Sequence, residues 1–598
     1  MVATQSGKPS APKRSAMVGW YDPRQLLVTG LQTVLSSLFG RRADFRLLEA
    51  LGGEPIVADY SREDELWVDY IADVGDGFNS TYALARTLAS PSLVVRDEED
   101  KARASADGGN EGGQAGEGGK TKGAAGQGSE AAKAGPAGNL RLPRGSILVM
   151  GGDQVYPAPS PAQYQERLVM PYSCALRPDQ DGKAVDLFAI PGNHDWYDGL
   201  GSFINLFCHG RTIGGYTTPQ KRSYFALRFK RGFWLWGLDV QLDGDLDNPQ
   251  LEAFRAIEHL AKGDRVILCL AEPHWVYDAW RARAKEPPPP WQSNLERLEA
   301  HVAARGAKVV LKVAGDLHHY RHHAPCQGGP HLVTAGGGGA FLHPTHGRRI
   351  DEIPIGAPPP ERTHVRTKQY PEASTSFWLS FRNLAFPFYN PLFGIVTGFA
   401  YMILSWVMPP PARTWEEPPL TALVTLLRSG LTSFADSPSG LVWTLLVLLS
   451  FVAFTDADDR LFKWVAGLLH GSIHLGAALL VATLSLRLAG PAALTDPIYS
   501  RFAISLGSFA GGYLLGGFIM GVYLLGAINL FGCHGNEAFS SLRIEGYKNF
   551  LRMRLDARGL TVWALGLRRV PSASAWRWVD EGEGKGHYQI RPGVPEPS

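Results

Sequence analysis

Four short motifs with acidic, amide, phenol and imidazole side chains follow one another along the first half of this sequence. Each motif comes directly after an apolar stretch typical of a buried strand, so its polar side chains stand where a strand gives way to a loop. Side chains placed in this way can converge on a pair of metal ions that activates water for attack on a phosphate ester. In chain order the motifs are Asp73-Val-Gly75, Gly152-Asp153-Gln-Val-Tyr156, Gly192-Asn193-His194-Asp195 and Gly315-Asp316-Leu-His318.

These residue types suit metal-assisted hydrolysis. Carboxylates neutralise hard cations and can bridge two of them, while imidazole or amide groups complete the coordination. Two such ions, ~3.5–4 Å apart, lower the pKa of a bound water. A nearby imidazole can stabilise charge or protonate the departing alkoxide. Glycines beside the candidate ligands allow the backbone to turn tightly beneath them.

Composition sets the broad class. A chain of 598 residues is long enough for two or more domains. The formal net charge of +2 gives no reason to expect a nucleic-acid partner. The five cysteines are far apart and form no Cys-x-x-Cys pair, which indicates reduced thiols in a reducing compartment. We expect no signal peptide, because the N-terminus lacks a continuous apolar core.

The chain divides by pattern. Residues 1–60 form a lead-in, and residues 61–350 alternate strand-like and helix-like stretches, which predicts an α/β domain. Within that domain, residues 97–140 carry almost no large apolar side chain. Such a segment buries too little surface to offset its ordering entropy, so we expect a disordered insertion there.

The second half is predicted to be a membrane domain. A Pro-rich basic linker at residues 351–383 precedes transmembrane helices within residues 384–531. Three of four apolar stretches are long enough to cross the ~30 Å hydrocarbon core, and the second is near the lower limit. We therefore expect about four spans. They are Phe386–Met408, Gly440–Thr455, Val465–Leu488 and Phe502–Phe531.

Basic residues predict the orientation of these spans. Lys and Arg are abundant before the first span and after the last, which places the catalytic domain and both termini in the cytoplasm. Residues 532–598 are expected to be a soluble, β-rich tail with a hairpin that turns at Gly559. His470 and His474 share one helical face in the third span, where an inter-helix hydrogen bond is the favoured role and a metal site or proton relay the alternative.

The order of the four motifs resembles the calcineurin-like metallophosphoesterase superfamily over roughly residues 66 to 346. The resemblance implies a four-layer α/β/β/α sandwich and two metal ions, of Fe, Mn, Mg or Zn. It also implies a role for each matching residue. Asp73 and His318 would bind the first metal, Asp153 would bridge both, Asn193 would bind the second, and His194 would act as acid or charge stabiliser, oriented by Asp195.

The sequence departs from the usual pattern at four places. Most members of the superfamily have His where Gly75 stands, and many have Asp where Tyr156 stands. Both changes together resemble the purple acid phosphatase branch, in which the tyrosine is a ligand of ferric iron; a core tyrosine is the alternative. Asp316 replaces a histidine and would favour a harder ion. In Ala271-Glu272-Pro273-His274 the usual histidine before proline is missing, so His274 or Glu272 would be the ligand.

The resulting functional prediction is a membrane-anchored, metal-dependent phosphoester hydrolase. Its partners would be a phosphoester substrate and the lipid bilayer, with no nucleic acid expected. The alternative is a membrane sensor or transporter whose phosphoesterase-like domain is degenerate and only binds a ligand. The glycine run at residues 336–339 would either cradle phosphate or pack closely under the metal site.

Overall fold

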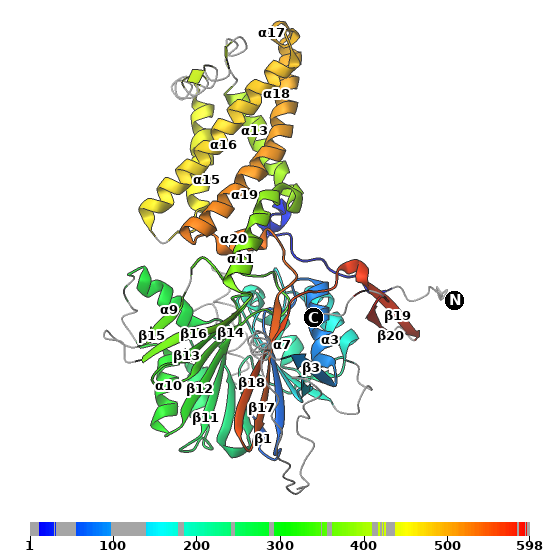
Figure 1. The fold of residues 1–598 in the computed structure, drawn as a ribbon, viewed down its shortest axis with the longest axis vertical. Coiled ribbons are helices and arrows are strands. Elements are labelled where there is room, and N and C mark those ends of the chain that lie inside the picture. Colours follow the sequence, from blue (N-terminus) through cyan, green and yellow to red (C-terminus); the bar gives the residue numbers. More distant parts are fainter. Residues whose placement is uncertain are drawn as a thin grey trace, which may run out of the picture.

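The computed structural model describes residues 11–28, 56–96, 139–176, 184–240, 245–285, 292–348, 350–355, 362–408, 437–457, 459–582 and 585–592, with a few single positions between them. Two large β-sheets and their helices form one end of the molecule, and a helical region forms the other (Figure 1). The expected insertion at residues 97–140 lies outside the described residues, except that Asn139 and Leu140 begin a short strand. The lead-in is described over residues 11–28.

The seven-stranded sheet contains three of the strands that carry motifs, which run parallel as neighbours. In spatial order its strands are β18 (Gly559–Leu567), β17 (Lys548–Asp556), β2 (Leu66–Ile71), β5 (Ile147–Gly151), β6 (Val185–Ile190), β8 (Tyr216–Thr217) and β7 (Thr212–Ile213).

The nine-stranded sheet carries the fourth motif on β12, which runs parallel to its neighbour β11. In spatial order its strands are β1 (Val57–Tyr60), β9 (Phe225–Phe229), β10 (Phe233–Gly237), β11 (Arg265–Leu270), β12 (Lys308–Ala314), β14 (His331–Ala335), β13 (Tyr320–Pro325), β16 (Arg362–Tyr370) and β15 (Glu352–Ile355).

Three hydrophobic cores hold the layers together. One lies between the sheets and includes Val149 of β5 and Ile267 of β11. The second lies between the seven-stranded sheet and the helices α3 (Phe78–Ala89), α6 (Met170–Ala175) and α7 (Gly201–Phe207). The third lies under α8 (Asn248–Arg255), α9 (His274–Arg283) and α10 (Asn294–Ala304). Strands buried on both faces explain the continuous apolar runs in the sequence.

Two segments predicted to lie outside the α/β domain belong to it. The expected linker supplies β15 and β16, and β16 pairs with β13. The expected tail forms the predicted hairpin, but β17 also pairs with β2, so this hairpin completes the seven-stranded sheet. The sequence of β16 is polar, so its pattern predicts a linker. It forms a strand because backbone pairing does not require apolar side chains. The last strands, β19 (Trp576–Gly582) and β20 (Lys585–Ile590), form a separate hairpin.

Among the described residues of the helical region, two helical segments are long and apolar enough to cross a membrane, namely α16 (Arg460–Ala489) and the continuous segment Pro497–Phe531. A third would be the pair Ala373–Tyr389 and Pro391–Val407, which bends by 65° between its halves. The four spans expected from the sequence are not confirmed, because α15 (Pro438–Phe454) has 17 residues and falls short of the others.

Glycines let these helices approach closely. A Cβ on Gly516 would lie 2.5 Å from Cβ of Thr397 on α13 (Pro391–Val407), so only a glycine fits at this crossing. The predicted inter-helix hydrogen bond is present for His474, whose Nδ1 on α16 lies 3.0 Å from the hydroxyl of Tyr401 on α13, whereas neither ring nitrogen of His470 has a hydrogen-bond partner among the described residues.

Candidate active site

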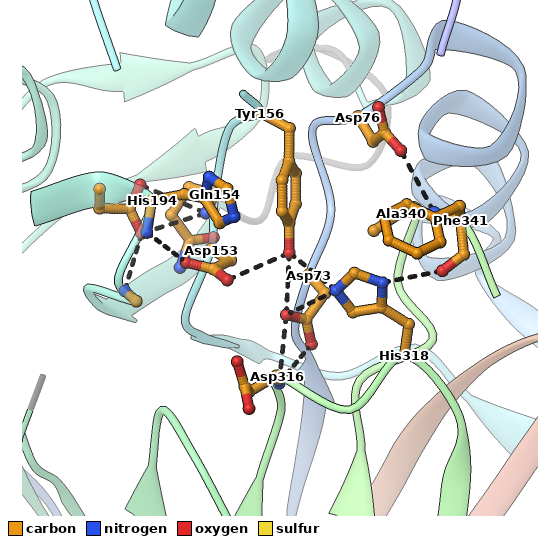
Figure 2. A network of polar contacts seen from close by, with 12 residues as sticks. Asp73, Asp76, Asp153, Gln154, Tyr156, His194, Asp316, His318, Ala340 and Phe341 are labelled. Carbon is orange, nitrogen blue, oxygen red and sulfur yellow. Dashed lines mark hydrogen bonds and ion pairs between the residues drawn. The ribbon is translucent and has the colours of Figure 1, made fainter. Parts of the chain in front are cut away.

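The four motifs meet where parallel strands of both sheets end. Asp73 follows β2, Asp153 follows β5, His194 follows β6, and Asp316 and His318 follow β12 (Figure 2). The carboxyl ends of parallel strands share one edge of a sheet, and the two sheets bring their edges together.

Three of the aspartates have a strained backbone. Asp73, Asp153 and Asp316 have φ angles of 59°, 50° and 67°. Left-handed conformations are uncommon outside glycine and cost free energy, so they persist where the surroundings enforce them and cluster at functional sites. Each turn therefore holds its carboxylate at a fixed place at the end of its strand.

The phenol of Tyr156 lies at the centre of the group. Its hydroxyl oxygen is 3.0 Å from Oδ1 of Asp73, 3.1 Å from Oδ2 of Asp153 and 3.1 Å from Nε2 of His318 (Figure 2). The phenol is buried, with 1% of its surface exposed. One hydroxyl has one proton, so it satisfies one of these three acceptors.

Gly75 explains how Tyr156 reaches this place. The loop after β2 runs beside the loop after β5, with the amide of Gly75 donating to Gln154 and the amide of Tyr156 donating to Gly75. A Cβ on Gly75 would lie 2.3 Å from the carbonyl oxygen of Gln154. A histidine at position 75 would therefore push the two loops apart. Gly75 and the position of Tyr156 are therefore one structural feature.

Backbone carbonyls orient both histidines. Nδ1 of His318 lies 2.8 Å from the carbonyl oxygen of Phe341, and Nδ1 of His194 lies 2.7 Å from that of Pro157. A carbonyl only accepts, so Nδ1 carries the proton in each ring, and the lone pair of the neutral ring is on Nε2. Burial lowers the pKa of both imidazoles, most strongly for His318.

Asp195 differs from its predicted role. It accepts hydrogen bonds from the amides of Gln154 and Gly192 and from the hydroxyl of Tyr164, and no described contact joins it to the ring of His194. Asp195 thus ties the loops after β5 and β6 together, so it is a positioning residue. The amide of His194 in turn donates to Oδ1 of Asp153 at 2.9 Å.

The helix α9 brings Tyr277 to Asp316. The hydroxyl of Tyr277 donates to Oδ2 of Asp316. His274 makes no described contact with the acidic group, and after burial the charges that lower its pKa are Lys312 and Arg281. The charge of Glu272 contributes to raising the pKa of Tyr277. The half-buried Asn193 has no described side-chain contact with the group.

The acidic group, formed by Asp73, Asp153 and Asp316, carries unbalanced negative charge. Burial, followed by repulsion from Asp153 and Asp316, raises the pKa of Asp73 well above its usual value. Burial and Asp316 raise the pKa of Asp153 to about 7. Burial also raises the pKa of Asp316. Burial is the largest cause of each shift, and neighbouring carboxylates add to it for Asp73 and Asp153.

Three residues near the site gave no signal in the sequence. Trp20 lies edge-on to Tyr156 and His194, with ring centroids 6.4 and 5.9 Å apart. Asp76 is fully buried and accepts from the amides of Val18 and Phe341, which fixes the N-terminal segment against the site. Lys548, on β17, is fully buried beneath the site, where burial lowers its pKa to about 8.

The glycine run at residues 336–339 packs under the carboxylates. A Cβ on Gly336 would lie 2.5 Å from Oδ2 of Asp73, and one on Gly337 would lie 2.0 Å from Nδ2 of Asn549. These contacts favour the packing interpretation of the run over the phosphate cradle.

The donor set fits a hard cation. Three carboxylates, a phenol and a neutral imidazole meet with more acceptors than protons, and a cation would relieve both the repulsion and the shortage of donors. Within the described residues, no group of three or more His, Cys, Asp or Glu side chains is already arranged around a metal position. The central group here is a phenol, with the carboxylates and the imidazole gathered around it.

Comparison with known proteins finds no related sequence and only weak structural similarity. No protein-family model matches this sequence, and no curated protein matches it. Among solved structures, GAP50, the anchor in the inner membrane complex of Plasmodium, is 11% identical with a TM-score of 0.28, over 47% of this chain and 74% of that chain. Purple acid phosphatase PPD1 from yellow lupin (Lupinus luteus) seeds is 11% identical with a TM-score of 0.27, over 52% of this chain and 48% of that chain. At these values neither likeness carries a functional argument.

Proposed function

We propose that this protein is a membrane-anchored, metal-dependent phosphoester hydrolase. One observation carries the proposal, which is the convergence of Asp73, Asp153 and His318 on the phenol of Tyr156 at the ends of strands from two sheets. Asp316 adds a third carboxylate, since its amide donates to both carboxylate oxygens of Asp73 at 3.1 and 2.9 Å.

Some of the site residues would bind the metal ions, and others would assist the reaction. Asp73, Asp153, Asp316, Tyr156 and His318 would hold the metal ions, with Asn193 as a further ligand from the loop after β6. When bound, such ions supply a water of lowered pKa and charge stabilisation for the phosphoryl group. A carboxylate-rich set favours Mg²⁺ or Mn²⁺, while the phenol favours ferric iron, so the metal is one of these or zinc.

His194 would assist the departing group. Its ring is held by the carbonyl of Pro157, and the Asp316 charge faces it across the site. With Nδ1 engaged, Nε2 is the atom through which His194 exchanges a proton with substrate. Trp20 and Tyr197 flank the ring, so the substrate would enter between aromatic walls.

The helical region would anchor this domain in a bilayer. Counting the bent pair and α15 as spans gives four crossings, which returns the chain to the side from which it came. That count agrees with β17 and β18 returning to the sheet that contains β2. The basic residues flanking the helices would place the catalytic domain on the cytoplasmic side.

The direct test is hydrolysis of a general aryl phosphate by the purified full chain, with and without added Mn²⁺, Mg²⁺, Zn²⁺ or ferrous iron. We expect metal-dependent turnover in the wild type, none in Asp153→Asn, and unchanged turnover in Asp59→Asn, which alters an exposed carboxylate on β1. Equal turnover by the wild type and Asp153→Asn would contradict the proposal.

The second candidate is a membrane sensor or transporter in which this domain only binds a ligand. It is favoured by the finding that the described residues hold no ready-made cluster of His, Cys, Asp or Glu side chains. Metal binding without turnover on monoesters, diesters or nucleotides would support this candidate over the hydrolase.

A further inference from the structure

A cleft of ≈ 610 Å³ lies where the helical region meets the α/β domain. One wall is the segment after the glycine run, another is the helix α11 (Ala373–Ser380), and the third is the end of the last long helical segment. Its lining includes Arg348, Ser374, Phe377, Trp378, Asn529 and Phe531. Figure 1 shows α11 at this junction, between the helices and the sheets.

The cleft lies at the level where a bilayer would end. The helical segment Ala373–Tyr389, which begins with α11, makes an angle of 65° with α13. If α13 crosses a membrane, α11 therefore lies close to the membrane plane. Trp378 on α11 is 68% exposed, and Leu530 at the end of the last long segment is 77% exposed. Exposed aromatic and aliphatic side chains on a helix in this orientation are typical of the membrane–water interface.

The cleft combines this apolar rim with polar groups. Arg348 lines the cleft, and its guanidinium lies 5.8 Å from the ring centroid of Trp280 on α9. Nδ1 of His346 lies 2.7 Å from the hydroxyl of Ser376. Nδ2 of Asn529 donates to Ser380, while its Oδ1 is buried and has no hydrogen-bond partner among the described residues. A ligand that matches all of these features has an anionic head, a hydroxyl or amine donor and apolar chains.

We propose that this cleft binds one membrane phospholipid, with the headgroup phosphate at Arg348 and the acyl chains along Phe377, Trp378 and Phe531. A cation at headgroup level attracts the phosphate, and the exposed rim continues into the hydrocarbon region. The site is separate from the candidate active site and does not depend on hydrolase activity. It would seat the α/β domain at a fixed height on the membrane surface.

The test uses the purified full chain in a maltoside detergent, with phosphatidylglycerol added and retained lipid counted by native mass spectrometry. We expect one tightly retained lipid per wild-type chain. Arg348→Gln removes the phosphate contact, and a charge-assisted contact of this kind corresponds to a ~10-fold or larger loss in affinity. Ser374→Trp fills the cleft from an exposed position, so it tests the site without disturbing a packed residue.

The matched control is Arg382→Gln, which removes the same charge from an exposed position beside α11 that does not line the cleft, and it should retain the lipid. Two further ligands show whether the headgroup or the acyl chains are recognised. Glycerophosphoglycerol has the headgroup without chains, and dioleoylglycerol has chains without phosphate, and both should bind at least ~10-fold more weakly. Equal binding of either ligand, or wild-type lipid retention in both cleft variants, would overturn the proposal.

Discussion

Two buried aspartates four residues apart on the β2 segment have opposite surroundings. Asp69 forms a bidentate ion pair with Arg552 of β17, with Nε 2.7 Å from Oδ1 and Nη2 2.8 Å from Oδ2. Asp73 lies among other acids, and its described hydrogen-bond donors are the phenol of Tyr156 and the amide of Asp316. Both carboxyl groups are almost fully buried.

The difference separates a structural acid from a candidate ligand. Arg552 offsets the charge of the buried Asp69 carboxylate, although burial still raises the pKa of that group. The group around Asp73 contains three carboxylates, while the buried Lys548 directs its ammonium to the carbonyls of Ala340 and Ile544. The charge of Asp69 is matched within the chain, whereas the proposed function would match the three carboxylates with cations from solution.

The largest expected effect is that of Asp153→Asn on activity. Loss of one holding carboxylate removes several kcal/mol of transition-state stabilisation, which corresponds to a fall of about 10³-fold in kcat/KM. In metal-free protein the same change relieves repulsion, so the unfolding temperature should rise. Steady-state kinetics and thermal unfolding in EDTA measure the two effects, and a lower unfolding temperature would count against the charge argument.

Asp69→Asn should have the reverse profile. It leaves Arg552 buried without its partner, and breaking a buried pair in this way costs about 3–5 kcal/mol of folding free energy. Activity per folded molecule should be retained, because Asp69 does not touch the site. Denaturant unfolding together with active-site titration checks this. A stable but inactive variant would contradict the claim that Asp69 has a structural role and Asp73 a role in the site.

The metal-free protein should lose stability as pH rises. The pKa of Asp153 is about 7 and that of Asp195 about 8 in the folded chain, both raised chiefly by burial from 3.8. A raised acid pKa stabilises the folded state below pH ~4, and that stability is lost as the pH passes through 7 and 8. Each pKa unit corresponds to about 1.4 kcal/mol. Unfolding in EDTA at pH 5 and pH 8 should show this fall, and saturating Mn²⁺ should flatten it. Identical slopes with and without metal would argue against ion binding at these carboxylates.

Trp20→Ala should have the smallest effect. The indole lies edge-on to His194 and Tyr156, and an aromatic contact of this kind contributes about 0.5–1.5 kcal/mol. We expect KM for an aryl phosphate to rise about 2- to 10-fold with kcat nearly unchanged, and Trp20→Phe to restore part of the loss. A large fall in kcat instead would give Trp20 a role in the chemistry.

Much of the site could be predicted because its residues follow buried strands. Asp73, Asp153, Tyr156 and His318 each come directly after an apolar run, and parallel strands bring such positions to one edge. The role of Asp195 could not be predicted, since its partners are backbone amides of another loop. The contact of Tyr277 with Asp316 could not be predicted, because the turn of α9 decides which of its side chains faces the site, and the choice of His274 or Glu272 as a ligand stays a prediction.

The fold was predicted less well where pairing joins distant segments. The hairpin at Gly559 was recognised from its alternation, but its attachment to β2 depends on contacts such as Arg552 with Asp69, which are 483 residues apart. Trp20 and Asp76 escaped notice for the same reason, since neither lies in a local pattern that indicates a site. In the helical region, the prediction of four spans is not confirmed, because α15 has 17 residues and is shorter than the helices that could cross a membrane on their own.

The metal content of the purified full chain tests the central claim most directly. Elemental analysis should find about two equivalents of metal per chain in the wild type and in Asp59→Asn, and a loss in Asp153→Asn. A visible charge-transfer band that disappears in Tyr156→Phe would identify ferric iron bound to the phenolate. One equivalent or none, unchanged by either site substitution, would contradict the account.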